Sequence, residues 1–214
     1  MINPLYISKI TDQSWHRELV ESMWKQGYVM LSDFLTPDAF SELRATGERL
    51  ANKKTIELQG SIADRLAHSE EFMALFNGLH KIRAEKEGKD FVPLQPERQM
   101  IGFPYKDARD GKRTEETEYH YDGAYANATL ALKMPETGGE LIAFPNLRTS
   151  KNAFLIKLFS RALRHVPFLR RVVPHIIARS RPNDLCLFFG DRTFHGVEPI
   201  ESGERLILTI NSHW

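Results

Sequence analysis

Residues 183–197 read NDLCLFFGDRTFHGV, and this stretch decides how the second half of the chain folds. The turn-forming sequence Pro182-Asn183-Asp184 precedes an apolar run, which predicts a buried strand over residues 184–189. His195 follows directly after that strand. The same stretch therefore predicts both a core strand and a candidate functional side chain beside it.

Further short segments around this stretch also have the character of strands, because they are rich in Leu, Ile, Phe and Thr. They cover residues 98–103, 129–134, 140–144 and 205–212, and turn-forming sequences at 135–139 and 201–204 separate them. We expect the strand that begins at Arg205 to run antiparallel to the segment leading into His195. A small antiparallel β-sandwich or barrel with helices on one face is the simplest fold for this pattern.

The first 90 residues have a mainly helical pattern. Thr11 or Asp12 can cap a helix that Gly27 ends, and a strand is expected at residues 28–31. A second helix is expected to begin at Thr36-Pro37, with a third over residues 69–87. Helices first and strands afterwards predict a mainly β fold with α-helical support.

One segment interrupts the series of strands. Between residues 141 and 183 there are nine basic and no acidic residues, and residues 146–180 are predicted to form a basic helical insertion between strands. The insertion could be a lid over the active site, a dimer or partner surface, or a patch for an anionic substrate or nucleic acid. Nucleic acid is the least favoured, because the segment lacks interleaved exposed aromatic residues.

Length and composition predict one globular domain over residues 1–214, with a formal net charge of +1 that indicates no particular partner. Cys186 is the only cysteine, so no disulfide can form within the chain and a reducing compartment is favoured. The N-terminal sequence lacks the pattern of a signal peptide, and no segment approaches the length of a membrane span. We therefore expect a cytoplasmic monomer or homodimer with no membrane partner.

His120, Tyr121 and Asp122 form a His-x-Asp triplet. Residues i and i+2 of a strand point to the same face, so His120 and Asp122 can reach one metal ion. With His195 as the third ligand, they would cover one face of an octahedral Fe(II) and leave the other positions open. Ligand type alone leaves zinc, manganese or nickel possible.

Arg205 lies ten residues beyond His195. Its position favours a metal site that also binds a keto-acid cosubstrate. A guanidinium can bind one carboxylate of a dicarboxylate with two hydrogen bonds, while the keto-acid end chelates the metal. The alternative is an ordinary surface ion pair between Arg205 and Glu201 or Glu204.

With these motifs, the chain resembles the Fe(II)/2-oxoglutarate-dependent oxygenases, in particular the small-molecule branch similar to phytanoyl-CoA hydroxylases. The resemblance covers most of the chain, at residues 27–35, 120–122, 138–141, 183–188 and 195–197, and at Arg205. It implies a double-stranded β-helix, a jelly-roll or cupin-like core, over residues 91–214, with N-terminal helical support from residues 1–90. It also implies Fe(II), 2-oxoglutarate and O2 as cofactor and cosubstrates, with His120, Asp122 and His195 as metal ligands and Arg205 as the 2-oxoglutarate anchor.

One position departs from the pattern of many relatives, which have Ser or Thr two residues after the arginine, where this chain has Ile207. The supporting hydroxyl must then come from elsewhere. Thr129 is the preferred candidate, and Tyr105 and Thr209 are the others. On the substrate side we expect Asn211, Trp214 and Tyr121.

The resemblance implies oxidative decarboxylation of 2-oxoglutarate to succinate and CO2, coupled to hydroxylation of an unactivated C–H bond. A free or modified amino acid, or a natural-product intermediate, is the expected kind of substrate. Asp122 argues against halogenation, since related halogenases have a small residue there, whereas desaturation or cyclisation stay open. Two other classes stay open: a non-catalytic binding module that uses the basic insertion, and a cupin-like metalloenzyme that ignores 2-oxoglutarate and leaves Arg205 unexplained.

Overall fold

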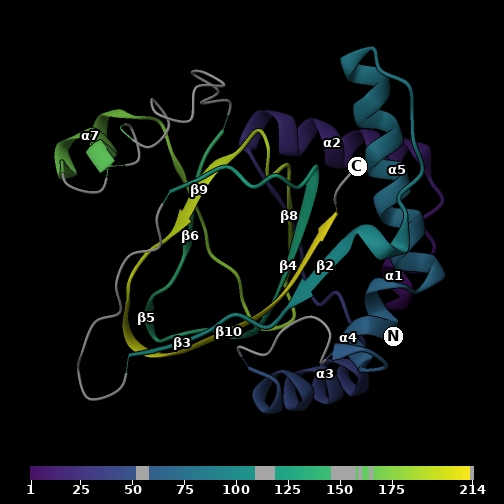
Figure 1. Cartoon of the computed structure of the whole chain (residues 1–214), viewed down its shortest axis with the longest axis horizontal. Coiled ribbons are helices and arrows are strands. Elements are labelled where there is room, and N and C mark those ends of the chain that lie inside the picture. The colour runs from purple at the N-terminus through teal and green to yellow at the C-terminus, as the bar shows by residue number, and fades with distance from the viewer. Residues whose placement is uncertain (52–57, 109–118, 146–157, 159–160, 164–165, 213–214) are drawn as a thin grey trace.

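Two antiparallel sheets face one another, and helices cover the outer side of the larger sheet (Figure 1). The structure is a computed structural model that describes residues 1–51, 58–108, 119–145, 158, 161–163 and 166–212.

The larger sheet has seven strands, and its main path runs β1-β8-β4-β10-β2. These strands are β1 (Val29–Leu31), β8 (Leu185–Phe188), β4 (Ala126–Lys133), β10 (Ile200–Ser212) and β2 (Gln99–Gly102). The short strands β3 (Tyr105–Ala108) and β5 (Thr137–Gly138) also pair with β10. The smaller sheet has the order β7-β6-β9, formed by Ile176–Ala178, Leu141–Phe144 and Phe194–Val197. Every strand pairing in the described part of the chain is antiparallel, as the sequence predicted.

The first 90 residues contribute five described helices and the edge strand β1. The helices are α1 (Pro4–Ile7), α2 (Gln13–Gln26), α3 (Pro37–Arg49), α4 (Ile62–Ala67) and α5 (Glu70–Glu87). A 3₁₀ turn at Pro96–Arg98 precedes β2. The three predicted helices correspond to α2, α3 and α5. Asp12 caps α2 through its side chain, and Gly27 ends the helix in the left-handed region at φ 84°. No helix among the described residues has both the length and the apolar character needed to cross a bilayer.

Side chains alternate along the strands, and this alternation produces separate layers. On the outer face of the large sheet, strand residues pack against the helices, as Leu130, Leu187 and Leu208 do with Phe72 and Phe76 of α5. The space between the sheets holds Leu141, Ala178, Cys186 and Phe188. On the outer face of the small sheet, Ile142, Phe144 and Phe194 pack with Leu169 of α7 (Pro167–Val172). The alternate positions, which include Thr129, His195 and Arg205, therefore point into the space between the two sheets.

Three predictions were wrong in detail. The insertion predicted over 146–180 is not helical throughout: α7 ends at Val172, and β7 follows as a strand that pairs with β6. Pro174 lies between these elements, where it cannot continue the helix. The predicted turn at 201–204 lies within β10, which has a register shift between Ile200 and Ser202 and a left-handed residue at Gly203, with φ 89°. Finally, β10 pairs with β4 and not with the segment that leads into His195, because β9 belongs to the other sheet.

The predicted basic insertion is only partly described. Residues 146–157 lie outside the described residues, while α7 and β7 fall within the predicted 146–180. Whether the whole segment acts as one insertion stays a prediction.

Candidate metal centre

His120, Asp122 and His195 come together at the end of the space between the sheets, near the start of β4 and beside β9. His120 Nε2 lies 3.1 Å from Asp122 Oδ1, and His195 Nε2 lies 3.4 Å from Asp122 Oδ2. One ligand atom from each residue lies within 4.8 Å of the other two. Metal–ligand bonds of about 2.1 Å at right angles put neighbouring ligand atoms about 3 Å apart. The three side chains therefore fit one face of an octahedral ion.

The His-x-Asp triplet reaches this position differently from the prediction. Only His120 has a strand-like pairing, an isolated bridge to His195 in which each backbone N–H donates to the other residue's carbonyl at 2.9 and 3.0 Å. Asp122 lies in the loop that follows, where its backbone N–H donates to the Gly190 carbonyl at 3.0 Å. His195 therefore comes from strand β9 of the small sheet, whereas the Asp122 carboxylate comes from the loop after His120.

The orientation of His195 is fixed by its own backbone neighbourhood. Its Nδ1 lies 2.8 Å from the Thr193 carbonyl oxygen, so Nδ1 carries the proton and Nε2 keeps its lone pair toward Asp122. The Thr193 hydroxyl donates to the Gly27 carbonyl at 3.1 Å. His195 is therefore presented as a neutral ligand by a carbonyl that is itself held in place.

Asp122 is held by Asn127, whose side-chain amide donates to Asp122 Oδ2. Burial alone would raise the pKa of Asp122, but hydrogen bonds and charge from His120 and His195, when their imidazoles are protonated, lower it well below its usual range. The carboxylate is therefore ionised, as a metal ligand must be.

Arg205 points into the same space from β10, and within the described part of the chain it makes no ion pair; its Nε is buried without a hydrogen-bond partner. Burial lowers the pKa of Arg205 to about 10, which still leaves the guanidinium charged at neutral pH. The alternative ion pair with Glu201 or Glu204 is not formed; Glu204 instead binds Lys133 at 3.1 Å. A buried cation without an anion is costly unless a ligand completes the pair, so the geometry suits an incoming carboxylate.

The three candidates for a second cosubstrate contact differ in the face of the large sheet on which their side chains lie. Thr129 lies on the inner side of β4, opposite Cys186 of β8, and its hydroxyl interacts with the Cys186 thiol, on which Arg205 also acts electrostatically. Tyr105 packs on the helix side and its hydroxyl lies 3.2 Å from Asp107, so it faces away from the site. Thr209 also lies on the inner side, but its hydroxyl donates to the Gly102 carbonyl at 3.3 Å. Among these three, Thr129 has the placement that suits the role.

The residues predicted on the substrate side have mixed positions. Asn211 occupies an inner position of β10. The Tyr121 ring packs against Phe194, at 5.1 Å between ring centroids, and so belongs to the outer face of the small sheet. Trp214 lies outside the described residues.

Sequence reasoning missed several residues that shape this site. Asn127 was detectable as a polar residue at an inner position of β4, in step with Thr129. Gly190 backs onto Asp122, since a Cβ at this glycine would lie 2.7 Å from the Asp122 Cβ. Arg83 of α5, almost fully buried, holds the neighbouring turn from the helix side. The sequence carried no signal for these two contacts, because both partners are distant along the chain.

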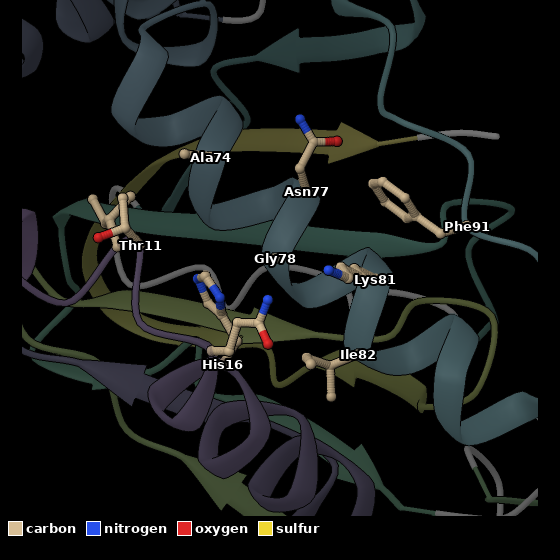
Figure 2. A pocket seen from close by; sticks show the side chains of 10 residues that line it. Thr11, His16, Ala74, Asn77, Gly78, Lys81, Ile82 and Phe91 are labelled. Carbon is tan, nitrogen blue, oxygen red and sulfur yellow. The ribbon is translucent and has the colours of Figure 1, made fainter.

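A cavity of about 310 Å³ lies elsewhere, between the segment leading into α2 and the helix α5 (Figure 2). Ile10, Thr11, Gln13, His16, Ala74, Asn77, Gly78, Lys81, Ile82 and Phe91 line it. It includes none of the predicted site residues, so it is separate from the candidate metal centre.

No family model and no curated protein matches the sequence. Solved structures do match. The non-haem α-ketoglutarate-dependent epimerase SnoN from nogalamycin biosynthesis is 17% identical with a TM-score of 0.70, over 94% of this chain and 82% of that chain. HygX from Streptomyces hygroscopicus, solved with nickel, 2-oxoglutarate and hygromycin B, is 14% identical with a TM-score of 0.61, over 92% and 86%. A Pseudomonas putida prolyl-4-hydroxylase is 16% identical with a TM-score of 0.54, over 92% and 93%.

These three structures do not include a phytanoyl-CoA hydroxylase, so that branch stays a prediction. The likeness extends over nearly the whole chain and confirms the predicted fold class. The chain has the double-stranded β-helix fold of the iron- and 2-oxoglutarate-dependent oxygenases.

Proposed function

We propose that the protein is an Fe(II)- and 2-oxoglutarate-dependent oxygenase that oxidises a C–H bond of a small molecule. The observation that carries the proposal is the pairing of two features in one space. Three ligand atoms from His120, Asp122 and His195 lie within 4.8 Å of one another, and Arg205 enters the same space with no anionic partner among the described residues. A metal site alone would not explain the arginine.

Each residue then has a distinct task. His120, Asp122 and His195 would hold Fe(II), and Arg205 would bind the distal carboxylate of 2-oxoglutarate, with Thr129 as its second contact. Bound iron would supply the activation of O2 that couples decarboxylation of the keto acid to oxidation of the substrate. The apolar side chains between the sheets, such as Phe188 and Leu141, exclude water from that reaction.

Hydroxylation is the outcome that we propose, with desaturation or cyclisation as alternatives. SnoN is described as an epimerase and HygX was solved with hygromycin B, so proteins of this fold act on or bind elaborate small molecules in more than one way. The carboxylate of Asp122 occupies the position that related halogenases leave open. A small-molecule substrate, amino acid or natural-product intermediate, is therefore favoured over nucleic acid.

We further propose that residues 1–214 form one catalytic unit in which residues 1–90 support the core of 91–214, working as a monomer or homodimer. We keep the cytoplasm as the proposed compartment, because the single cysteine, Cys186, is buried and free.

The test is anaerobic addition of Fe(II) and then 2-oxoglutarate to purified protein. A visible charge-transfer band that needs both is expected, and on admission of O2 succinate should form, faster with the right member of a panel of small molecules. Full occupancy by Fe(II) without that band, and with no succinate, would contradict the proposal. Such a result would favour the binding-module or cupin-like alternatives.

A further inference from the structure

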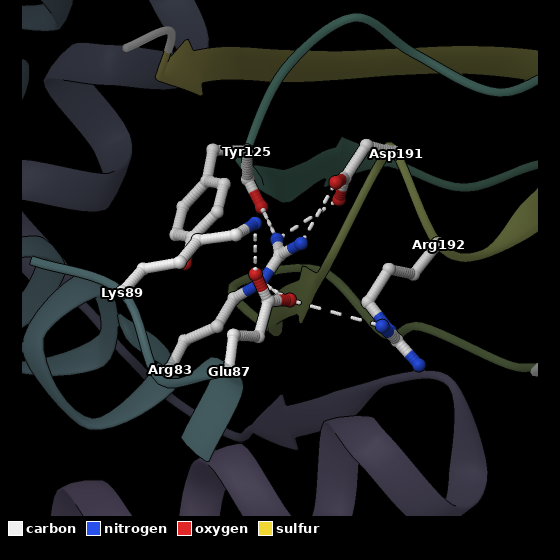
Figure 3. Close-up of polar contacts among 6 residues, drawn as sticks. All are labelled: Arg83, Glu87, Lys89, Tyr125, Asp191 and Arg192. Atoms are coloured by element: carbon white, nitrogen blue, oxygen red, sulfur yellow. Dashed lines mark hydrogen bonds and ion pairs between the residues drawn. The ribbon is translucent and has the colours of Figure 1, made fainter. Parts of the chain in front are cut away.

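Figure 3 shows an ion pair between the buried Arg83 of α5 and the partly exposed Asp191, which follows β8. Arg83 of α5 is 1% exposed, and its guanidinium binds Asp191 with two hydrogen bonds of 2.9 and 2.7 Å. The same guanidinium donates to the Tyr125 carbonyl at 2.6 Å and to Glu87 at 2.9 Å. It also lies over the rings of Tyr125 and Phe189, at 3.6 and 4.4 Å from their centroids.

These contacts join two chain segments that carry the metal ligands. Tyr125 comes three residues after Asp122, while Phe189 and Asp191 belong to the turn that connects β8 to the strand of His195. Within this turn, residues 189–193, the Asp191 N–H donates to the Ala124 carbonyl at 3.1 Å. Arg83 therefore fastens the 189–193 turn to the loop of Asp122.

The 189–193 turn also touches two ligands directly. Its Gly190 carbonyl accepts the Asp122 N–H at 3.0 Å, and a Cβ at Gly190 would lie only 2.7 Å from the Asp122 Cβ. Its Thr193 carbonyl lies 2.8 Å from His195 Nδ1. Displacement of the turn would therefore move the carboxylate and would turn the imidazole at the same time.

We propose that Arg83 and Asp191 are positioning residues for the metal centre: their two-pronged ion pair holds the 189–193 turn where it sets the geometry of Asp122 and His195. This inference rests on the proposed metal site. Neither residue touches a metal ligand, and both act through Gly190 and Thr193. The bidentate geometry fixes direction as well as distance, which a single point contact does not.

The chain offers a matched control in Glu87. Asp191 and Glu87 each give one carboxylate to the same guanidinium, but Glu87 lies on α5 and, among the described residues, also forms ion pairs with Lys89 and Arg192. Asp191→Asn and Glu87→Gln each remove one negative charge from the Arg83 cluster. Asp191→Asn breaks the two-pronged hold on the turn, whereas Glu87→Gln removes only the longer contact of 3.7 Å with Arg192 of that turn.

The experiment titrates metal-free protein with Co(II), a coloured probe of the site, and reads both its affinity and its visible spectrum alongside thermal unfolding. Both variants should lower the melting temperature. Asp191→Asn should also weaken Co(II) binding about tenfold or more and alter the spectrum, the range seen for residues that orient metal ligands. Glu87→Gln, which loses only the 3.7 Å contact with the turn, should change the Co(II) affinity by less than about twofold and leave the spectrum close to that of wild type.

Equal Co(II) affinity in wild type and Asp191→Asn would overturn the inference and reduce the ion pair to a stabilising role. Equal loss in both variants would do the same. If Asp191→Asn does not fold, Arg83→Lys keeps the charge but loses the fork, and an unchanged Co(II) spectrum there overturns the inference. Wild-type protein that binds no Co(II) would instead contradict the metal site itself, so the two failures are distinguishable.

Discussion

Gly190 and Asp122 are packed so closely that no side chain fits between them: a Cβ on Gly190 would lie 2.7 Å from the Asp122 Cβ and 2.8 Å from Asn127 Nδ2. The glycine is required here for space, because its φ lies outside the left-handed range that favours glycine. The closeness of the turn to Asp122 fixes where the carboxylate can point.

Gly190→Ala should therefore displace Asp122 or break its contact with Asn127. We expect metal affinity to fall about tenfold or more, by analogy with other residues that orient ligands, and stability to fall by about 1–3 kcal/mol from overpacking. Isothermal titration with a divalent metal and urea unfolding measure the two effects. Gly123→Ala is the control, since a Cβ at this neighbouring glycine meets nothing within 4 Å. Equal metal affinity in the two variants would show that Asp122 does not depend on Gly190.

Arg205→Ala should abolish most 2-oxoglutarate binding and spare metal binding. Charge-assisted hydrogen bonds are worth about 1.5–3 kcal/mol each, so loss of a two-pronged contact should weaken binding at least a hundredfold. Arg205→Lys should recover only part of this, because an ammonium lacks the planar fork. The measurement compares 2-oxoglutarate and metal affinities on the same protein. Parallel loss of both affinities would instead assign Arg205 a structural role.

Thr129→Val tests the second cosubstrate contact. Valine keeps the shape of the side chain and removes the hydroxyl, so a contact with the bound keto acid should be lost at a cost of about 0.5–1.5 kcal/mol, or roughly twofold to twelvefold in affinity. Thr209→Val is the matched control, because the Thr209 hydroxyl is already bonded to the Gly102 carbonyl. Titration of 2-oxoglutarate into both metal-loaded variants measures the effect. An unchanged affinity in Thr129→Val, or a larger loss in Thr209→Val, would remove Thr129 from the site.

The parts of the fold that were predictable are those with local causes. Asp12 and Gly27 mark the ends of α2 through a cap and a left-handed residue, and the apolar run before His195 forms a strand because it can be buried on both faces. The pairing of β10 with β4 was not predictable. No local sequence feature shows that β9, which carries His195, belongs to the other sheet and so cannot pair with β10. Residues 176–178 were included in the predicted helical insertion because they form a strand through pairing with β6, a distant contact that the local sequence does not reveal.

The candidate site shows the same division. His120, Asp122, His195 and Arg205 were found because their chemistry is visible as residue type and spacing. Arg83 was not found, because a charged residue on a helix is usually solvated. The Asp191 carboxylate that pairs with it in the fold is 108 residues away along the chain. Residues that hold ligands in place leave little trace in a single sequence when their partners are distant.

The burial of His80 should make the free energy of unfolding depend on pH. It is buried on α5, where its Nε2 lies 3.0 Å from Ser212 Oγ, and the Ser212 hydroxyl in turn donates to the Ala126 carbonyl at 2.9 Å. Burial, with a smaller contribution from the charge of Arg83, lowers the pKa of His80 from the usual 6.5 of a histidine to about 3. As the pH falls from 6.5 toward 3, His80 becomes protonated in the unfolded chain but stays neutral in the native state. The free energy of unfolding that is present above pH 6.5 is therefore progressively lost. His80→Gln cannot take up this proton, and its free energy of unfolding should fall less steeply than that of wild type below pH 6.5. Urea unfolding at several pH values compares the slopes, and parallel curves for the two proteins would show that His80 titrates normally in the native state.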